Sequence, residues 1–515
     1  MTNRTWDAVV IGGGVAGLSA AQMLGRARRR TLVVDAGAPR NRFATHMHGV
    51  LGHDGVDPAE LLARGRTEAS AYGVAIESGT VTVIDDLGDH LRLTRADGTI
   101  DLSRAVVLAA GVADELPDVP GLADRWGRDV LHCPYCHGFE VAGRRLGVLA
   151  TSPASIHQIE IVRQWSDDVT AFTSAAEPLP DEVRARLTAR GIRIVATPIA
   201  SVDVADDALV AVVTADGGRH AVDALFTAPT PRIALDFAGG LDLTRTDGPG
   251  SPLAVDATGA TSHPRVWAAG NLVAPYGNVP LSMGSGSMAG AGANAGLVAE
   301  DAAHAVAQRR AARNAHWEER YADSDRVWSG QVNATTAAVV ETLPPGTALE
   351  IGCGEGADAV WLAEHGWTVT AVDVSASAIA RAAGAAAERG LEIDFRTADA
   401  VGDLPAGAFD LVVSSFLHSW ESDFPRIAIL RDALARVAPG GHLLAVSHAA
   451  PPPWARELPA HLPPMRTPAE ELALLDLDPE EWSFERAELR RREARDPDGN
   501  PAHLDDGVLL LRRLG

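Results

Sequence analysis

The sequence predicts an α/β protein in which two parallel-sheet units follow one another along the chain. Apolar β-type runs, such as 8–11, 31–34 and 106–109, alternate with alanine-rich helical patterns, which is typical of parallel strands covered by helices. A strand that runs into a glycine-rich turn occurs twice, at 6–17 and at 347–356. The chain of 515 residues also exceeds what one hydrophobic core usually supports.

Composition indicates an ordinary globular chain with a strong acidic bias. Hydrophobic residues make up 46% of the sequence, the formal net charge is -23, and lysine does not occur. Phosphate backbones and anionic lipid repel so much negative charge, so we expect no nucleic acid and no membrane as a partner. The absence of lysine excludes Schiff-base chemistry. The first apolar stretch is interrupted by glycines and lacks a basic leader, so we expect a cytoplasmic protein.

The first glycine-rich turn has the spacing of a dinucleotide-binding fingerprint. A short apolar strand runs into Gly12, Gly14 and Gly17, in the order G-x-G-x-x-G. These glycines allow a tight turn, a close approach of the backbone to a pyrophosphate, and close packing of helix on strand. The next strand, 31–34, ends in Asp35, which is placed to accept hydrogen bonds from ribose hydroxyls. The combination favours this interpretation over a purely structural turn.

A cysteine pair, Cys133 and Cys136, followed by His137, is the most informative segment of the chain. Two cysteines separated by two residues can form a small reducible disulfide. The segment also satisfies the haem-attachment pattern C-x-x-C-H, but that pattern belongs to exported proteins. A zinc site needs further ligands, and only His132 and His137 lie close in sequence. We therefore favour redox chemistry over haem, zinc or a structural role, and we expect no metal.

A second segment of the first unit lies far downstream, where strand 266–268 leads into Ala269, Gly270 and Asn271. The order of glycine fingerprint, cysteine pair and this return segment resembles low-molecular-weight thioredoxin reductase over about the first 310 residues. By this resemblance, Gly270 and Asn271 help to bind FAD. Asn271 stands where the family has Asp, and it can still hydrogen-bond a hydroxyl.

The resemblance implies a two-domain flavoprotein disulfide reductase fold. The FAD-binding domain is expected in two parts, 1–113 and 232–310, with an inserted redox domain of the NADPH-binding type at 114–231. In the family one cysteine faces the flavin and the other attacks the substrate disulfide. These roles are carried over to Cys136 and Cys133, respectively. His137 stands where the family has an Asp acid, and histidine can serve as base as readily as acid near neutral pH.

The segment after strand 145–149 departs from the family pattern. It reads Ala-Thr-Ser-Pro-Ala-Ser at 150–155, with no second G-x-G-x-x-G, and Pro153 removes a backbone N–H that a phosphate cradle would use. The stretch Phe172–Pro180 lacks the paired arginines expected to grip a 2′-phosphate. NADPH use is therefore open. The sequence looks more like the dithiol-oxidase branch of the family, which closes disulfides in small metabolites and passes electrons to oxygen.

The second glycine-rich turn, at 347–356, resembles motif I of class I S-adenosylmethionine (SAM)-dependent methyltransferases, and implies a Rossmann-like domain at 311–515. An NAD-binding domain is the alternative. Cys353 within the turn is expected to be a buried small residue rather than a nucleophile. The resemblance implies these SAM-binding residues: Glu350, Gly352, Gly354 and Gly356 around the turn, Asp373 at the next strand end for the ribose, and Asp399 for the adenine.

Two features bear on the methyl acceptor. The segment Trp317–Tyr321 looks like the lid of thiopurine- and tellurite-type methyltransferases, which act on small soft nucleophiles. His418 and Trp420 follow the strand 409–413 that borders the acceptor site, and they either line the substrate pocket or belong to core and surface.

We therefore expect a bifunctional enzyme that carries FAD and SAM. One half interconverts a dithiol and a disulfide, on a small molecule or a thioredoxin-like protein, and the other methylates a small molecule, in particular a thiol. An NADPH-dependent thioredoxin reductase fused to an unrelated methyltransferase is the first alternative, and a flavin redox sensor is the second. A homodimer is expected.

Overall fold

The computed structural model describes residues 4–418, 424–454, 465–496 and 498–515. The chain divides into two compact units, Met1–Ala303 and His304–Gly515, here called unit 1 and unit 2. Helix α6 (Val279–Ala322) belongs to both, and the predicted boundary between residues 310 and 311 falls within it. No helix among the described residues is long and apolar enough to cross a membrane.

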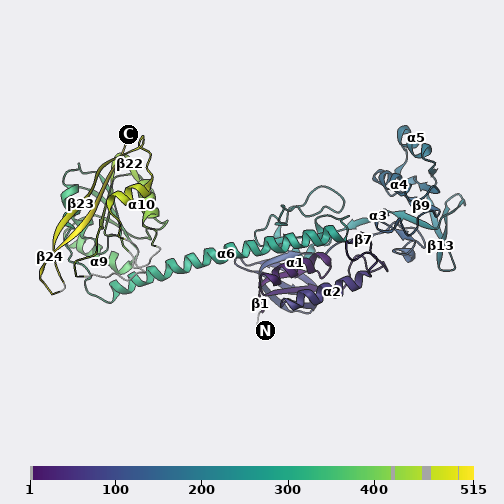
Figure 1. Cartoon of the computed structure of the whole chain (residues 1–515), viewed down its shortest axis with the longest axis horizontal. Helices are drawn as coiled ribbons and strands as arrows, with labels where there is room; N and C mark the ends of the chain where they lie inside the picture. Colours follow the sequence, from purple (N-terminus) through teal and green to yellow (C-terminus); the bar gives the residue numbers. More distant parts are fainter. Residues whose placement is uncertain (1–3, 419–423, 455–464, 497) are drawn as a thin grey trace. The chain divides into compact units, whose positions relative to one another are not determined.

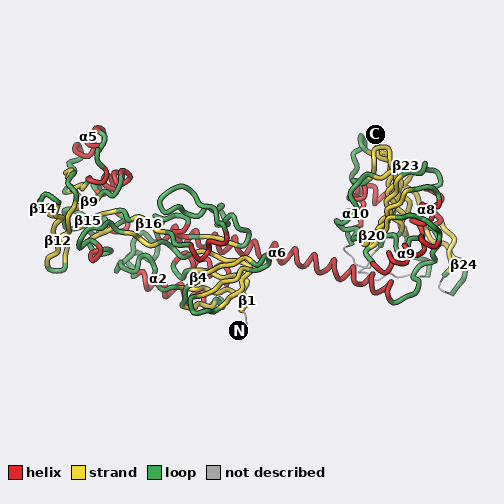
Figure 2. Tube along the Cα trace, turned by 180° about the vertical axis from the view of Figure 1, so that it is seen from behind, coloured by secondary structure: helices red, strands yellow, loops and turns green. Residues whose placement is uncertain are grey.

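Unit 1 is built on a seven-stranded sheet with the order β3-β2-β1-β6-β5-β4, and β17 pairs with β6 (Figures 1 and 2). Strands β1, β2, β3, β6 and β17 are parallel, whereas β4 and β5 form an antiparallel extension. The bounds are β1 (Arg4–Ile11), α1 (Val15–Arg26), β2 (Thr31–Asp35), α2 (Pro58–Ala71), β3 (Ala75–Ser78), β4 (Val81–Asp86), β5 (Leu91–Arg95), β6 (Ile100–Leu108) and β17 (Val266–Ala268).

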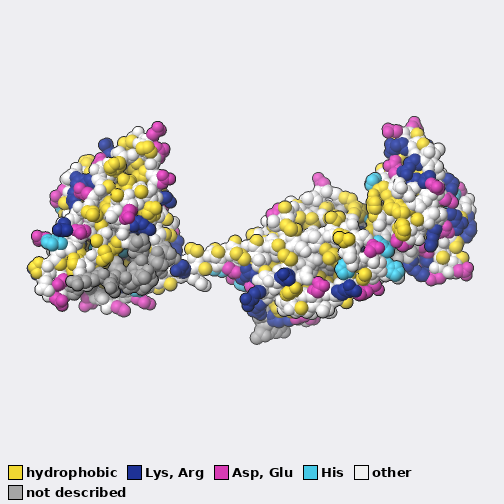
Figure 3. All heavy atoms as spheres, viewed as in Figure 1, with side chains coloured by type: hydrophobic (Ala, Val, Ile, Leu, Met, Phe, Trp, Pro, Cys, Tyr) yellow, Lys and Arg dark blue, Asp and Glu magenta, His cyan; other side chains and the backbone are white. Residues whose placement is uncertain are grey.

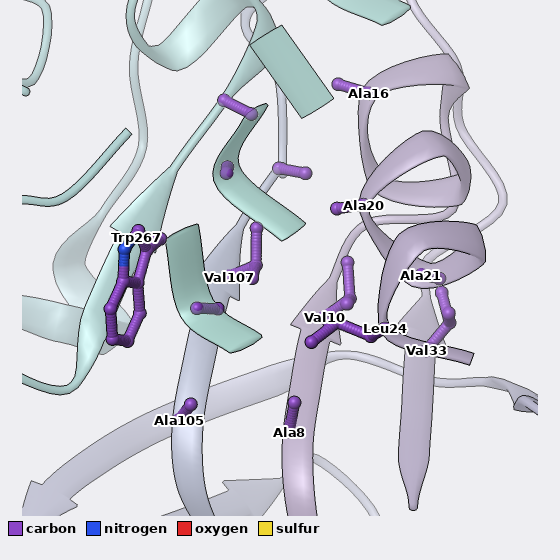
Figure 4. Close-up of a cluster of buried hydrophobic side chains, with 14 of the residues drawn as sticks. Ala8, Val10, Ala16, Ala20, Ala21, Leu24, Val33, Ala105, Val107 and Trp267 are labelled. Atoms are coloured by element: carbon purple, nitrogen blue, oxygen red, sulfur yellow. The ribbon is translucent and has the colours of Figure 1, made fainter. Parts of the chain in front are cut away.

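The core beside this sheet is made of small side chains, which let α1 and α6 approach closely. Figure 4 shows Ala16 and Ala20 of α1 on the same side of the sheet as Val10. A Cβ atom on Gly286 or Gly290 of α6 would collide with the backbone of α1 at Ala16 or Ala20. The glycine-rich start of α6 is therefore a packing surface, and substitution there forces the two helices apart.

A second domain of unit 1 is inserted between β6 and β17, and the chain crosses into and out of it through an antiparallel pair, β7 and β16. It holds a parallel sheet of order β11-β10-β9-β15-β8 and an antiparallel sheet of order β12-β13-β14. The bounds are β7 (Ala113–Glu115), β8 (Val130–Leu131), α3 (Pro134–His137), β9 (Leu146–Leu149), α4 (Ile156–Val162), β10 (Val169–Phe172), α5 (Asp181–Ala189), β11 (Arg193–Val195), β12 (Ile199–Ala205), β13 (Ala208–Thr214), β14 (Arg219–Ala221), β15 (Ala224–Thr227) and β16 (Thr230–Arg232).

Unit 2 has one seven-stranded sheet of order β20-β19-β18-β21-β22-β24-β23, in which only β24 and β23 introduce antiparallel pairs among the described residues. The strand order reverses between β18 and β21, and ligands bind at such a switch point, beyond the carboxyl ends of the strands. The bounds are α7 (Ala334–Val340), β18 (Thr347–Ile351), α8 (Ala357–Glu364), β19 (Thr368–Asp373), α9 (Ala376–Glu388), β20 (Asp394–Thr397), β21 (Phe409–Ser415), α10 (Arg426–Leu434), β22 (Val437–His448), α11 (Pro468–Leu475), β23 (Trp482–Arg495) and β24 (Pro501–Arg513).

Candidate functional site

The turn between β1 and α1 has the form of a phosphate cradle. Gly12 has a φ of +109°, and a Cβ atom there would lie within 2.7 Å of the carbonyl carbon of Ala109. A Cβ atom on Gly17 would collide with the carbonyl oxygen of Gly12. Gly14, the N-cap of α1, has no heavy atom within 4 Å of an added Cβ, so its backbone faces open space. Two glycines close the turn and the third leaves room for a ligand.

Asp35, at the end of β2, is held beside this turn by three donors. Its carboxylate accepts hydrogen bonds from the backbone N–H of Gly13 (3.1 Å) and Gly37 (3.0 Å) and from Nη2 of Arg66 (2.5 Å). Burial raises the pKa of Asp35, but these hydrogen bonds outweigh burial and the net pKa is lowered. A cavity of about 300 Å³ is lined by Gly37 and Arg66, two of the three donors to Asp35, although not by Asp35 itself. An ionised acceptor beside a cavity suits a ribose.

Gly270 and Asn271 lie next to the start of α1, although they are distant in sequence. Gly270 has a φ of +69°, and its added Cβ would lie 2.8 Å from Cβ of Ala16. The Nδ2 atom of Asn271 donates to the carbonyl oxygens of Ala274 and Gly277, both at 2.9 Å, which fixes the following turn. The open cradle, Asp35 and this segment thus fit FAD.

The cysteine pair forms a disulfide in the structure. Cys133 and Cys136 are joined with their Cα atoms 5.2 Å apart, and Cys133 is the N-cap of the short helix α3. Tyr135, between them, and Phe139, just after them, expose 76% and 82% of their surfaces. The disulfide therefore lies beside exposed aromatic side chains, which can contact a small apolar molecule.

His137 belongs to a group of histidines, and histidine side chains gather on one face of unit 1 (cyan in Figure 3). Burial lowers the pKa of His137, nearby Glu140 opposes this, and His48 and His132 lower it further. Nε2 of His48 lies 3.4 Å from Oε1 of Glu140. His137 is therefore neutral near pH 7 and can accept a proton. His48 and Glu140 were not predicted from the sequence as neighbours of this histidine.

A metal centre is not found in the described parts of the chain. No group of three or more His, Cys, Asp or Glu residues there has an arrangement that could hold a metal ion. Nδ1 of His132, the potential zinc ligand considered above, lies 3.2 Å from the carbonyl oxygen of Thr227.

The turn after β9 does not present a free phosphate cradle. The Oγ atom of Ser155 accepts hydrogen bonds from the backbone N–H of Thr151 (3.0 Å) and of Ser152 (3.4 Å). Pro153, at the start of the next turn, has no N–H. The donors that would bind a pyrophosphate are thus engaged by a side chain of the same turn, so the residues present do not fit the pyrophosphate of NADPH.

The segment after β10 carries an acidic side chain where a 2′-phosphate would need cations. Glu177 accepts hydrogen bonds from Oγ1 of Thr173 and from the backbone N–H of Leu179, both at 2.8 Å. The Leu179 hydrogen bond leads the contributions that lower the pKa of Glu177. Nη2 of Arg184 also donates to this carboxylate, at 2.9 Å, so this arginine is engaged by Glu177 rather than free to bind a 2′-phosphate.

Unit 2 contains a cavity of about 840 Å³ at its topological switch point. Glu350 is buried at its base, and its Oε2 atom has no hydrogen-bond partner among the described residues. Burial, followed by nearby Asp358 and Asp373, raises the pKa of Glu350. A buried acceptor without a partner, among carboxyl groups, suits a cationic ligand such as SAM.

Gly352, Gly354 and Asp373 line this cavity, whereas Gly356 packs against α9, where its added Cβ would lie 2.6 Å from Cβ of Ala382. Gly352, Gly354 and Gly356 all have positive φ values, of 74°, 52° and 79°. The carboxylate of Asp373 accepts hydrogen bonds from the backbone N–H of Gly354 (2.8 Å) and of Ser375 (3.0 Å). Asp373 thus joins the end of β19 to the glycine turn, where a ribose would lie.

Asp399 lies on the cavity wall and is bound by α6. Its Oδ2 atom accepts hydrogen bonds from Nδ2 of Asn314 (3.0 Å) and from Arg310 and Arg313 (2.6 and 3.2 Å). Its Oδ1 atom accepts one from the backbone N–H of Val401 (2.8 Å). This contact of α6 with Asp399 was not predicted from the sequence.

Aromatic side chains cover the glycine turn. Trp317, Tyr321 and Trp328 line the cavity, and Tyr321 Oη accepts a hydrogen bond of 2.8 Å from Nε1 of Trp328. An added Cβ on Gly354 would lie 2.8 Å from Tyr321 Oη. Cys353 is buried, and burial raises the pKa of its thiol, so it is unsuited to act as a nucleophile.

The other end of the cavity holds two histidines. His418 and His448 stack with their rings 5.2 Å apart, and Phe416, with a φ of +54°, packs 4.4 Å from His448. Burial leads the contributions that lower the pKa of His418 to about 3. Trp420 lies outside the described residues. His448 was not predicted, because nothing near it in the sequence marks it.

Fold and site geometry define the class of protein: a flavoprotein-type disulfide oxidoreductase followed by a methyltransferase. The chain belongs to the pyridine nucleotide-disulphide oxidoreductase family, whose model matches residues 6–295, and a methyltransferase domain matches residues 348–441. It is an enzyme with both activities, as the sequence predicted. The family implies flavin and pyridine nucleotide use, and the methyltransferase domain implies SAM.

Similar proteins cover unit 1. Thioredoxin reductase sirT of Leptosphaeria maculans is 32% identical over 306 residues, which are 56% of this chain and 93% of that protein. Thioredoxin reductase tcpT of Claviceps purpurea is 33% identical over 315 residues, 58% of this chain and 96% of that protein. The crystal structure of HlmI is 43% identical with a TM-score of 0.56, over 60% of this chain and 97% of that one. An oxidoreductase from Agrobacterium tumefaciens is 39% identical with a TM-score of 0.55, over 57% of this chain and 99% of that one.

Proposed function

We propose that unit 1 uses FAD to close a disulfide in a small dithiol, and that unit 2 uses SAM to methylate a small-molecule thiol. The direction of the redox reaction is inferred from the turn after β9, in which the backbone N–H groups are already hydrogen-bonded within the turn. The N–H groups of Thr151 and Ser152 already donate to Ser155, and Arg184 is engaged by Glu177. An oxidoreductase that cannot take electrons from NADPH takes them from its thiol substrate.

The reaction of unit 1 follows from the cysteine pair. A substrate thiolate attacks Sγ of Cys133, which breaks the bond to Cys136 and leaves a thiolate there. The second substrate thiol gives its proton to His137 and displaces Cys133, which closes the substrate disulfide and leaves two reduced cysteines. FAD would be held by Gly12, Gly14, Gly17, Asp35, Gly270 and Asn271, and when bound it would supply a two-electron acceptor for the reduced cysteines, with oxygen as the final acceptor.

Anaerobic stopped-flow absorbance tests this direction. The purified protein should be yellow, a small dithiol should bleach its flavin rapidly, and NADPH should bleach it slowly. Steady turnover of the dithiol with oxygen would exclude a sensor without catalytic activity. Rapid bleaching by micromolar NADPH would instead support the NADPH-dependent thioredoxin reductase that the names of the fungal relatives suggest.

Unit 2 is proposed to bind SAM through Glu350, Gly352, Gly354, Gly356, Asp373 and Asp399. The Oε2 atom of Glu350, which has no partner in the described parts of the chain, supports this, because SAM brings a cationic group that a buried carboxylate can bind. Calorimetric titration of the full chain with SAM, and mass spectrometry of a small thiol after incubation, test the two steps. We further propose a cytoplasmic homodimer, because the thiol chemistry suits a reducing compartment; analytical ultracentrifugation tests the dimer.

A further inference from the structure

We propose that His448 is the general base of the methyltransferase unit and takes the proton from a small, uncharged thiol. This inference rests on the proposed function of unit 2 and adds the residue that activates the acceptor. His448 is the last residue of β22, lines the large cavity, and exposes 35% of its side chain.

The two rings beside His448 hold its imidazole in place. Phe416 packs 4.4 Å away, and His418 stacks nearly parallel at 5.2 Å with an interplanar angle of 7°. The backbone N–H of His448 approaches Nε2 of His418 at 3.4 Å, so this nitrogen of His418 serves as the acceptor. His418 is a positioning residue, and His448 is the ring with a nitrogen available to a substrate.

A buried carboxylate lies near Nδ1 of His448. Asp506 lies opposite His448 in the antiparallel pairing of β22 with β24, and its Oδ1 atom is 3.9 Å from Nδ1 of His448. Asp506 is fully buried and accepts hydrogen bonds from Oγ1 of Thr335 (3.0 Å) and Nε of Arg492 (2.8 Å). The negative charge favours the proton on Nδ1, which leaves Nε2 of His448 to accept one.

The charges facing the two histidines are balanced. Arg492 pairs with Asp506, and Arg426 pairs with Glu471 at 2.5 Å. Burial lowers the pKa of His448, Asp506 opposes this, and Arg492 adds to it. The imidazole is therefore neutral near pH 7, and its surroundings favour an uncharged acceptor over an anion.

The reaction balances with one proton released. As Nε2 of His448 takes the thiol proton, the S–H electron pair stays on the acceptor sulfur. This sulfur forms a bond to the methyl carbon of SAM, while the electron pair of the broken carbon–sulfur bond returns to the donor sulfur. The products are a thioether, S-adenosylhomocysteine and a proton that His448 passes to water. A thiol, with an ordinary pKa of about 8.5, gives its proton to a histidine more readily than a phenol, near about 10.

Two thiols of different acidity test the base. Full-length protein with SAM is incubated without oxygen with 2-mercaptoethanol, which is mostly protonated at neutral pH, or with 4-nitrobenzenethiol, which is already ionised. His448→Gln should lower kcat/KM for 2-mercaptoethanol by roughly 100- to 1,000-fold and for 4-nitrobenzenethiol by less than about 5-fold. His442→Gln is the matched control, because it lies on the same strand and faces Glu485, 3.6 Å away.

The outcomes separate the claims. If His448→Gln lowers kcat/KM equally for both thiols, His448 is not the base, but the other claims stand. If wild-type protein binds SAM but methylates catechol, or methylates neither thiol, the claim that the acceptor is a thiol would be wrong. No SAM binding would refute the proposed function itself.

If His448→Gln does not fold, the pH dependence of kcat/KM in the wild-type protein tests for a base. With a working base, kcat/KM for 2-mercaptoethanol stays level from about pH 8 to about pH 7. A loss of about 10-fold, as the thiolate fraction falls, would show that no base acts.

Discussion

Replacing Glu350 with glutamine should change SAM binding and protein stability in opposite directions. In the free protein, Glu350 is buried against Asp358 and Asp373, and its Oε2 atom has no partner among the described residues. Glutamine has nearly the same volume and carries no charge. Its amide N–H groups can donate to the neighbouring carboxylates, so the repulsion is removed without leaving a cavity.

The magnitude follows from the loss of one charged hydrogen bond to the cationic ligand. Such bonds contribute about 1.5–3 kcal/mol, so the Kd for SAM should rise by roughly 10- to 150-fold. The free energy of unfolding of the SAM-free protein should rise by about 1–3 kcal/mol, because the buried carboxylate loses its desolvation cost. Since the pKa of Glu350 is raised by folding, this gain is absent in acid and appears as the pH rises above about 4.3.

Isothermal titration and thermal unfolding at several pH values measure the two effects. Wild-type protein should release a proton on binding SAM, which shows as a binding enthalpy that depends on the buffer, and Glu350→Gln should release fewer. Exposed Glu341, changed to glutamine, is the control for the loss of one charge in this unit. Unchanged SAM affinity in Glu350→Gln, or a loss of stability in the SAM-free protein, would refute the reasoning.

Three further predictions concern single side chains. Cys136→Ser should abolish the long-wavelength thiolate–flavin absorbance band and Cys133→Ser should keep it; the reverse result would exchange their roles. Asp373→Ala should weaken SAM binding in calorimetry, because the ribose loses its acceptor, and an unchanged Kd would contradict this role. Gly290→Ala should lower the free energy of unfolding, since its Cβ meets α1, whereas Gly284→Ala, with open space, should raise it by about 0.5–1 kcal/mol. Equal shifts of the melting temperature would refute the packing argument.

The two parallel-sheet units could be predicted because their signals are local. A strand, a glycine turn and a helix occupy adjacent positions, and the backbone at Gly12 and Gly352 requires a positive φ that glycine adopts freely. The acidic strand ends Asp35 and Asp373 follow by regular spacing. Each prediction therefore needed only one short segment and the alternation of strand and helix.

The surroundings of the proposed catalytic histidines could not be predicted in the same way, because they depend on contacts between distant residues. His48 approaches Glu140 across more than ninety residues, and His448 meets Asp506 only through the register of β22 and β24. No periodicity in the sequence fixes such pairings. Helix α6 is a similar case, since its contacts with Asp399 depend on how the helix lies against the cavity wall.

Even where the position was predictable, the charge state was not. Asp35 and Asp373 occupy equivalent strand ends, yet donors that include Arg66 lower the pKa of Asp35, whereas burial raises the pKa of Asp373. FAD carries an anionic pyrophosphate, so its cradle benefits from an arginine that balances the carboxylate. SAM carries cationic groups, so its cradle benefits from carboxyl groups that ionise when the ligand arrives. If the proposed function holds, the same strand end is adapted to ligands of opposite charge by the residues packed around it.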